Sequence, residues 1–120
     1  MSGFLASTSS DPEFSRWYKY GLDPFSWLTR PDTMPSIQYM LSSPVSIPMV
    51  GLVQMMQLLV AYKTLRMTPG EFAKSFSAAA GHSQGISMAA VMAASQTDSQ
   101  YSRNCMSVLG LLVLCATYAD

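Results

Sequence analysis

Two long apolar stretches dominate the hydrophobic pattern of the chain. Residues 49–66 are apolar on nearly every side of a helical projection, which predicts one helix buried in protein or lipid. Because Gln54 and Gln57 lie three residues apart on one face of this helix, we expect burial in protein rather than a membrane span. Residues 108–114 are also apolar and belong to a second predicted helix, which begins near Ser99.

Capping signals predict shorter helices before these two. Asp11, followed by proline and glutamate, is typical of a helix start, and apolar residues at helical spacing extend that helix to about Gly21. Asp23 and Pro24 repeat the signal and predict a short helix that contains Trp27.

The connection to the first long helix is predicted to be irregular, because prolines interrupt it, with one short extended segment at residues 45–47. After the long helix, Thr68 and Glu71 have the spacing of a capping box, which predicts a helix over residues 69–76.

A serine motif follows that helix. Gly81-His82-Ser83-Gln84-Gly85 has the form G-x-S-x-G, in which a serine lies on a tight turn between a strand and a helix. A strained backbone projects the serine hydroxyl, and the glycines, which lack a Cβ, let the flanking segments approach closely. We therefore predict a nucleophile elbow, with one short strand before it and a helix that begins near Gln84. The N–H groups of that helix would face a developing oxyanion.

The base that such a serine needs is not evident. His82 is the only histidine, and successive side chains at a sharp turn point in different directions, so we expect His82 to pack beside the elbow. A Ser–His pair cannot be completed within these 120 residues.

Composition narrows the function classes. Seven basic and seven acidic residues leave no net charge, so nothing favours nucleic acid as a partner. Charged residues make up only 12% of the chain, and ten methionines add apolar surface, which favours contact with other protein. Cys105 and Cys115 lack metal-ligand spacing and are expected to be buried, reduced thiols of a cytoplasmic protein. Residues 1–10 lack the features of a signal peptide and are expected to form a disordered lead.

A series of short motifs accompanies the serine motif in a fixed order. It includes Asp11-Pro12-Glu13-Phe14, Trp27-Leu28, Pro31-Asp32-Thr33, Pro44-Val45-Ser46, Gly51-Leu52-Val53-Gln54, Thr68-Pro69-Gly70-Glu71-Phe72 and Thr97-Asp98. Together with the serine motif, this set resembles the acyltransferase domain of the fungal-type fatty acid synthase beta subunit. The resemblance implies that residues 11–120 are a partial acyltransferase domain whose C-terminal part is missing. It also implies an α/β fold, of which this chain would be a mostly helical part with one short strand.

The same resemblance implies a mechanism. Ser83 would take an acyl group from coenzyme A, with the Gln84 backbone N–H as one oxyanion donor and Gly81, His82 and Gly85 shaping the elbow. The group would then pass to the phosphopantetheine thiol of an acyl carrier protein. In this family the general-base histidine lies well downstream of the serine, beyond these residues. An upstream G-Q-G segment that contributes to the oxyanion hole does not occur here.

The implied partners follow from this mechanism. They are an acyl-CoA, an acyl carrier protein, the remainder of the synthase and its alpha-type chain. Neither nucleic acid nor membrane is expected, and the segment itself is expected to bind no metal and no resident cofactor.

The acyl group is expected to be neutral. Family members that take malonyl groups hold the free carboxylate with an arginine on the helices after the elbow. Arg103 is the only arginine there, it comes just after a turn, and residues 108–114 offer no cation. A buried carboxylate without a cation is costly, so an acetyl group is favoured.

Two alternatives stay open. An α/β serine hydrolase also uses G-x-S-x-G, but it needs an acid and then a histidine after the serine, and only Asp98 and Asp120 follow. The other is an inactive truncated fragment or an interaction module in which Ser83 is inert.

Overall fold

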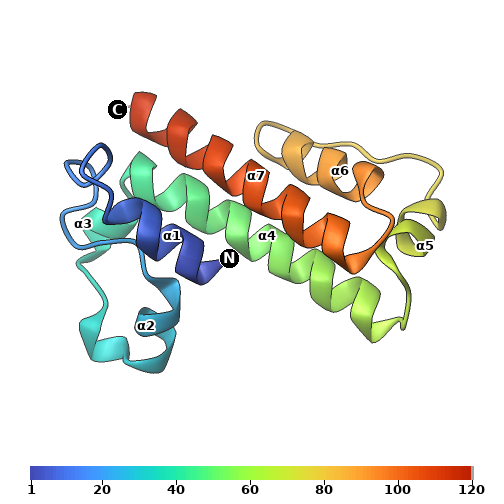
Figure 1. Cartoon of the computed structure of the whole chain (residues 1–120), viewed down its shortest axis with the longest axis horizontal. Helices are drawn as coiled ribbons and strands as arrows, with labels where there is room; N and C mark the ends of the chain where they lie inside the picture. The colour runs from blue at the N-terminus through green and yellow to red at the C-terminus, as the bar shows by residue number, and fades with distance from the viewer. Residues whose placement is uncertain (120) are drawn as a thin grey trace. The chain divides into compact units, whose positions relative to one another are not determined.

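The computed structural model describes residues 1–119, and every regular element within them is a helix (Figure 1). These elements are α1 (Ser2–Ser9), α2 (Pro24–Thr29), the 3₁₀ helix η1 (Pro31–Thr33), α3 (Ile37–Met40), α4 (Ser43–Thr64), α5 (Pro69–Lys74), α6 (Gly85–Ala94) and α7 (Asp98–Tyr118). The chain divides into two compact units. Unit 1 comprises residues 1–50 and the end of the chain from Leu111, and unit 2 comprises residues 51–110.

The predicted α/β fold, with a strand leading into the serine motif, is wrong for the described residues. Residues 78–81, which precede Ser83, belong to neither a helix nor a strand. A strand needs a ladder of hydrogen bonds to a neighbouring strand, and none forms in residues 1–119. The alanines at 78–80 also provide little of the side-chain packing that favours a strand.

In unit 1, α4 begins at Ser43 rather than near residue 49, and it contains the residues expected to be extended. Pro48 therefore lies inside the helix, where it has no N–H to donate to the carbonyl of Pro44, four residues before it. The Tyr18 hydroxyl donates to that carbonyl oxygen at 2.9 Å, in a buried position. A residue far away in the sequence thus provides the hydrogen bond that the proline removes.

The helix predicted over residues 11–21 does not form. Instead, Trp17 N–H donates to the Phe14 carbonyl and Tyr18 N–H to the Ser15 carbonyl, at 3.0 and 3.1 Å, as in a series of turns. These turns carry Tyr18 to its buried contact with α4, which local helix signals cannot indicate.

Residues 2–9 form α1, whereas the sequence predicts a disordered lead over residues 1–10. Leu5 is completely buried, and the Ser9 hydroxyl oxygen accepts a hydrogen bond from Leu22 N–H at 3.0 Å. The burial of Leu5 and the hydrogen bond to Ser9 therefore stabilise a segment whose composition is typical of disorder.

The predicted start of the short helix α2 is confirmed. Pro24 occupies the first turn, and the Asp23 carboxylate accepts a hydrogen bond from Ser26 N–H at 3.2 Å. A hydrogen bond from the Ser26 hydroxyl, together with this backbone hydrogen bond, lowers the pKa of Asp23.

Aromatic packing holds unit 2 together. Tyr62 of α4 and Tyr101 of α7 are buried edge to face, with ring centroids 5.3 Å apart, and Phe72 of α5 lies beside Tyr62. The Tyr101 hydroxyl donates to the Met55 carbonyl oxygen at 2.6 Å, so it joins α7 to the middle of α4. Burial raises the pKa of Tyr62 to about 12.

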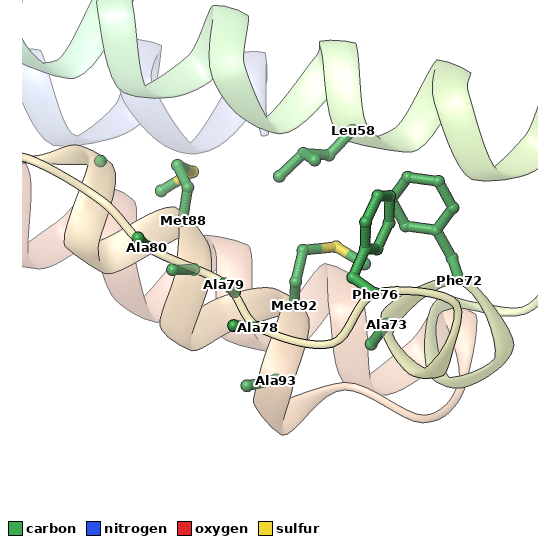
Figure 2. Close-up of a pocket in the computed structure, with 12 residues that line it drawn as sticks. Leu58, Phe72, Ala73, Phe76, Ala78, Ala79, Ala80, Met88, Met92 and Ala93 are labelled. Atoms are coloured by element: carbon green, nitrogen blue, oxygen red, sulfur yellow. The ribbon is translucent and has the colours of Figure 1, made fainter.

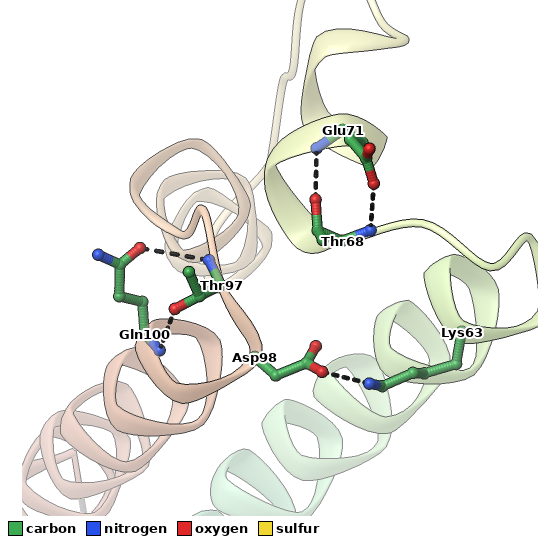
Figure 3. Close-up of polar contacts among 6 residues, drawn as sticks. All are labelled: Lys63, Thr68, Glu71, Thr97, Asp98 and Gln100. Atoms are coloured by element: carbon green, nitrogen blue, oxygen red, sulfur yellow. Dashed lines mark hydrogen bonds and ion pairs between the residues drawn. The ribbon is translucent and has the colours of Figure 1, made fainter.

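Polar contacts fix the loops at one end of unit 2 (Figure 3). The predicted capping box is confirmed, because Glu71 N–H donates to the Thr68 hydroxyl at 3.2 Å and Thr68 N–H donates to the Glu71 carboxylate at 2.7 Å. Lys63 of α4 pairs with Asp98 at the start of α7, and its hydrogen bond lowers the pKa of Asp98. Gly70 N–H donates to the Gln96 carbonyl at 3.3 Å, which ties α5 to the loop after α6.

Among the described residues, α4 is the one helix long and apolar enough to cross a membrane. Core helices of other proteins meet the same criteria, but only 33% of its apolar window is buried inside the protein, which is less than the sequence predicts for this helix. The expected absence of a membrane stays a prediction.

The two cysteines of α7 differ in exposure. Cys105 is buried, and burial raises the pKa of its thiol, whereas Cys115 is exposed, contrary to the prediction that both are buried. No cluster of three or more histidine, cysteine, aspartate or glutamate residues that could hold a metal is present in residues 1–119.

The Tyr18–Pro44 hydrogen bond leads to a first prediction. Tyr18→Phe should lower the free energy of unfolding by about 1–3 kcal/mol, because the buried Pro44 carbonyl would lose this hydrogen bond. Tyr118→Phe, at a side chain that is 83% exposed, is the control and should change it by less than about 0.5 kcal/mol. Urea denaturation of both variants provides the comparison, and equal stability of the two would contradict this role of Tyr18.

Candidate functional site

Ser83 lies on a tight turn directly before α6. Its φ angle is +55°, in the left-handed region that residues other than glycine rarely adopt. Gly85 N–H donates to the His82 carbonyl at 3.0 Å, and Ile86 N–H donates to the Ser83 carbonyl at 3.1 Å, which closes the turn onto the helix. The Ser83 side chain is exposed. A strained backbone therefore presents a hydroxyl to solvent at the start of a helix.

The two glycines of the motif have different surroundings. A Cβ built on Gly81 would lie 2.2 Å from the carbonyl carbon and oxygen of Gly85. Because these are backbone atoms, no side-chain movement can relieve the clash. A Cβ built on Gly85 would meet nothing within 4 Å. Close approach of the two segments thus requires glycine at Gly81 only.

The start of α6 provides a favourable environment for negative charge. Gln84 is the N-cap residue, and its side chain makes no capping hydrogen bond to the helix. The N-terminal N–H groups of a helix carry a partial positive charge, which favours an anion close to them. Whether the Gln84 backbone N–H donates to an oxyanion stays a prediction.

The expected role of His82 also stays a prediction. His82 is exposed and adjacent to Ser83. Asp98, the acidic residue that follows the motif within residues 1–119, is paired with Lys63. These residues therefore position a serine hydroxyl but do not show a base beside it.

An apolar groove of about 540 Å³ lies beside α6 in unit 2 (Figure 2). One face of α6 lines it with Gly85, Met88, Ala89, Met92 and Ala93, and residues 78–80 form another part of the lining. Phe72, Ala73, Phe76 and Leu58 complete it. No lining side chain carries a polar or charged group.

The groove was not predicted from the sequence, although the sequence contains a signal for it. Met88 and Met92, like Ala89 and Ala93, are four residues apart, which places each pair on one face of a helix. A row of large side chains beside a row of small ones can form a groove on the surface of a helix. What the pattern could not indicate is that residues 76–80 return alongside this face (Figure 2).

The contact at Gly81 leads to a second prediction. Gly81→Ala should lower the free energy of unfolding by about 1–3 kcal/mol, because its Cβ would overlap backbone atoms of Gly85. Gly85→Ala is the matched control and should leave stability unchanged or raise it by up to about 1 kcal/mol, since the new Cβ has open space at a helical position. If thermal and chemical denaturation rank the two variants in the opposite order, the close approach at Gly81 does not exist.

Comparison with known proteins matches nearly the whole chain to one family. The family described as "Starter unit:ACP transacylase in aflatoxin biosynthesis" matches residues 7–119. This range includes the turn at Ser83, the groove beside α6 and both long helices.

Curated relatives come from fungi. The chain is 45% identical over 93 residues to the fatty acid synthase beta subunit aflB of Emericella nidulans, an alignment that covers 78% of this chain and 4% of the relative. It is 38% identical over 104 residues to the fatty acid synthase beta subunit TOXC of Cochliobolus carbonum, covering 87% of this chain and 5% of that protein. With the fatty acid synthase subunit beta of Schizosaccharomyces pombe, it shares 38% identity over 112 residues, covering 93% of the chain and 5% of the relative.

The chain spans only about 4–5% of the length of these relatives. The resemblance to the acyltransferase domain of fungal fatty acid synthase beta subunits is confirmed, and this chain belongs to the starter unit:ACP transacylase family.

Proposed function

We propose that this chain is the serine-bearing segment of a fatty acid synthase starter acyltransferase that moves an acetyl group from coenzyme A to an acyl carrier protein. One observation carries the proposal: within the residues that match the transacylase family, Ser83 has a left-handed backbone and an exposed side chain at the start of α6.

The proposed reaction has two steps. In the first, Ser83 Oγ attacks the thioester carbonyl of acetyl-CoA, loses its proton to a base and forms an acetyl-serine ester, while coenzyme A leaves as the thiol. In the second, the phosphopantetheine thiol of the carrier attacks this ester, and Ser83 Oγ regains a proton. The N-terminus of α6, including the Gln84 backbone N–H, would stabilise the oxyanion of each step.

The base must come from outside these 120 residues, because His82 is the only histidine and lies next to Ser83 in the sequence. His82 would instead shape the turn together with Gly81 and Gly85. The chain therefore provides the nucleophile, and the rest of the active site would belong to the remainder of the synthase.

The surroundings of the motif favour a neutral acyl group. The groove beside α6 has no cation in its lining, and Arg103 is exposed on α7 and is not part of that lining. A malonyl carboxylate placed there would lose its hydration without gaining a counter-charge. This absence, within the described residues, supports acetyl over malonyl.

The proposed partners follow the family. They are acetyl-CoA, an acyl carrier protein, the remainder of the synthase and its alpha-type chain, in the cytoplasm. Nucleic acid and membrane are not among them.

A graft tests the role of Ser83. When this chain replaces the matching segment of the Schizosaccharomyces pombe subunit, the graft should transfer radiolabelled acetyl from acetyl-CoA to a carrier protein. Ser83→Ala in the graft should reduce the rate at least about 10³-fold, because the acyl-enzyme cannot form. His82→Ala is the matched control and should cost much less, since His82 is not the base. An active Ser83→Ala graft would contradict the proposal.

The isolated chain gives a separate prediction. With radiolabelled acetyl-CoA it should show little or no turnover, because it contains no histidine other than His82 to act as a base. Rapid acyl exchange by the 120-residue chain would show that a base lies within it.

A further inference from the structure

We propose that Ile86 limits hydrolysis of the acetyl ester on Ser83, so that the acyl group passes to a thiol rather than to water. This inference rests on the proposed function, because it assumes that the ester forms on Ser83 Oγ. It goes beyond that function by assigning a further specificity-determining residue, one that selects between two acceptors of the same acyl group.

Ile86 lies on the turn that carries the nucleophile. Its N–H donates to the Ser83 carbonyl at 3.1 Å and so closes a four-residue turn. The Cα atoms at the two ends of such a turn are less than about 7 Å apart. Both side chains are exposed, and that of Ile86 is 60% exposed. An acyl group on Ser83 Oγ would therefore come within side-chain reach of Ile86.

The Ile86 side chain is separate from the apolar groove. Gly85 and Ala89 line that groove, whereas Ile86 is not part of the lining. Within residues 77–87, the other side chains are small or polar, so Ile86 is the one large apolar side chain beside the serine. Contact between Ile86 and the methyl of an acetyl ester would remove apolar surface of both groups from water. The same contact would cover one side of the ester.

The segment around Ser83 offers few groups that could hold an attacking water molecule. Residues 75–97 contain no aspartate, glutamate, lysine or arginine, and His82 is their one residue that titrates near neutral pH. The side chain of Ile86 neither donates nor accepts a hydrogen bond, so a water molecule beside it would lose a partner. The carrier thiol is different, because it arrives on a phosphopantetheine arm whose binding can position it.

Thiol and water compete for the same ester. In transfer, the thiol sulfur bonds to the acetyl carbonyl carbon, the bond from that carbon to Ser83 Oγ breaks, and the thiol proton ends on Ser83 Oγ. In hydrolysis, the water oxygen forms the new bond, acetate is released, one water proton ends on Ser83 Oγ and the other goes to solvent. Keeping water from the ester slows hydrolysis alone, and protection of reactive intermediates is a general advantage of sites that exclude water.

The fate of the acetyl ester in the Schizosaccharomyces pombe graft tests the proposal. The graft is loaded with radiolabelled acetyl-CoA, freed of coenzyme A by gel filtration, and divided between buffer alone and buffer with pantetheine. Ile86→Thr and Ile86→Val introduce side chains of nearly the same shape that differ by a hydroxyl. Ile86→Thr should speed acetate release by about three- to tenfold, the effect of one hydrogen bond to the attacking water. Ile86→Val should release acetate within about twofold of the unsubstituted graft, and neither variant should change acetyl-pantetheine formation by more than about twofold.

Ala90→Thr is the matched control for position, since Ala90 is exposed one turn further along α6, and it should leave acetate release unchanged. If Ile86→Thr cannot be acetylated, Ile86→Ala replaces it, and acetate release should again be faster. Equal acetate release from the Thr and Val variants, an equal increase with Ala90→Thr, or an Ile86→Thr graft that speeds transfer as much as hydrolysis would overturn this inference and leave the proposed function intact. A graft that forms no acetyl ester on Ser83 would overturn both.

Discussion

The close packing of Gly81 against the first residues of α6 is the constraint on which the rest of the candidate site depends. The backbone of Gly81 lies so near Gly85 and Ile86 that a single added carbon would overlap them. With the chain held that tightly on both sides, Ser83 at the bend takes a positive φ, and its side chain stays exposed. The strain is local, and the helix that follows provides a partial positive charge that favours negative charge near this position.

The remainder of unit 2 gives that bend a fixed support. Tyr101 joins α7 to α4 through the Met55 carbonyl, and the Lys63–Asp98 pair links the same two helices at the start of α7. The Gly70 hydrogen bond to Gln96 connects α5 to the residues that follow α6. Since α6 is held at the end remote from Ser83, its N-terminus and the groove along its side keep a defined position within the unit.

Two helix starts predicted from local signals are confirmed, whereas the start predicted at Asp11 is wrong and the contacts between residues far apart in the sequence were not predicted. The capping box at Thr68 and the helix start at Asp23 depend on neighbouring residues alone, and both occur as predicted. The extension of α4 through Pro48 depends on a hydrogen bond from Tyr18, 26 positions from its acceptor, which no local pattern reveals. The same limit explains why residues 11–21 form turns and why residues 2–9 are helical.

The site shows the same division. The serine motif was visible in the sequence, and of the two glycines expected to allow close approach, Gly81 makes that contact and Gly85 does not. The strand expected before it does not form, because strand formation depends on a partner that the described residues do not provide. The groove was missed because part of its other side consists of Phe76 and residues 78–80, whose path beside α6 depends on the tertiary structure.

The most direct test of the account is the location of the acyl group on the protein. Trypsin would release residues 75–103 as one peptide, since Lys74 and Arg103 bound a stretch without lysine or arginine. After brief incubation of the graft with acetyl-CoA and acid quenching, fragmentation of this peptide by mass spectrometry should place the acetyl ester on Ser83 and on no other serine. An acetyl group on a different residue, or one spread evenly over several serines, would contradict the account.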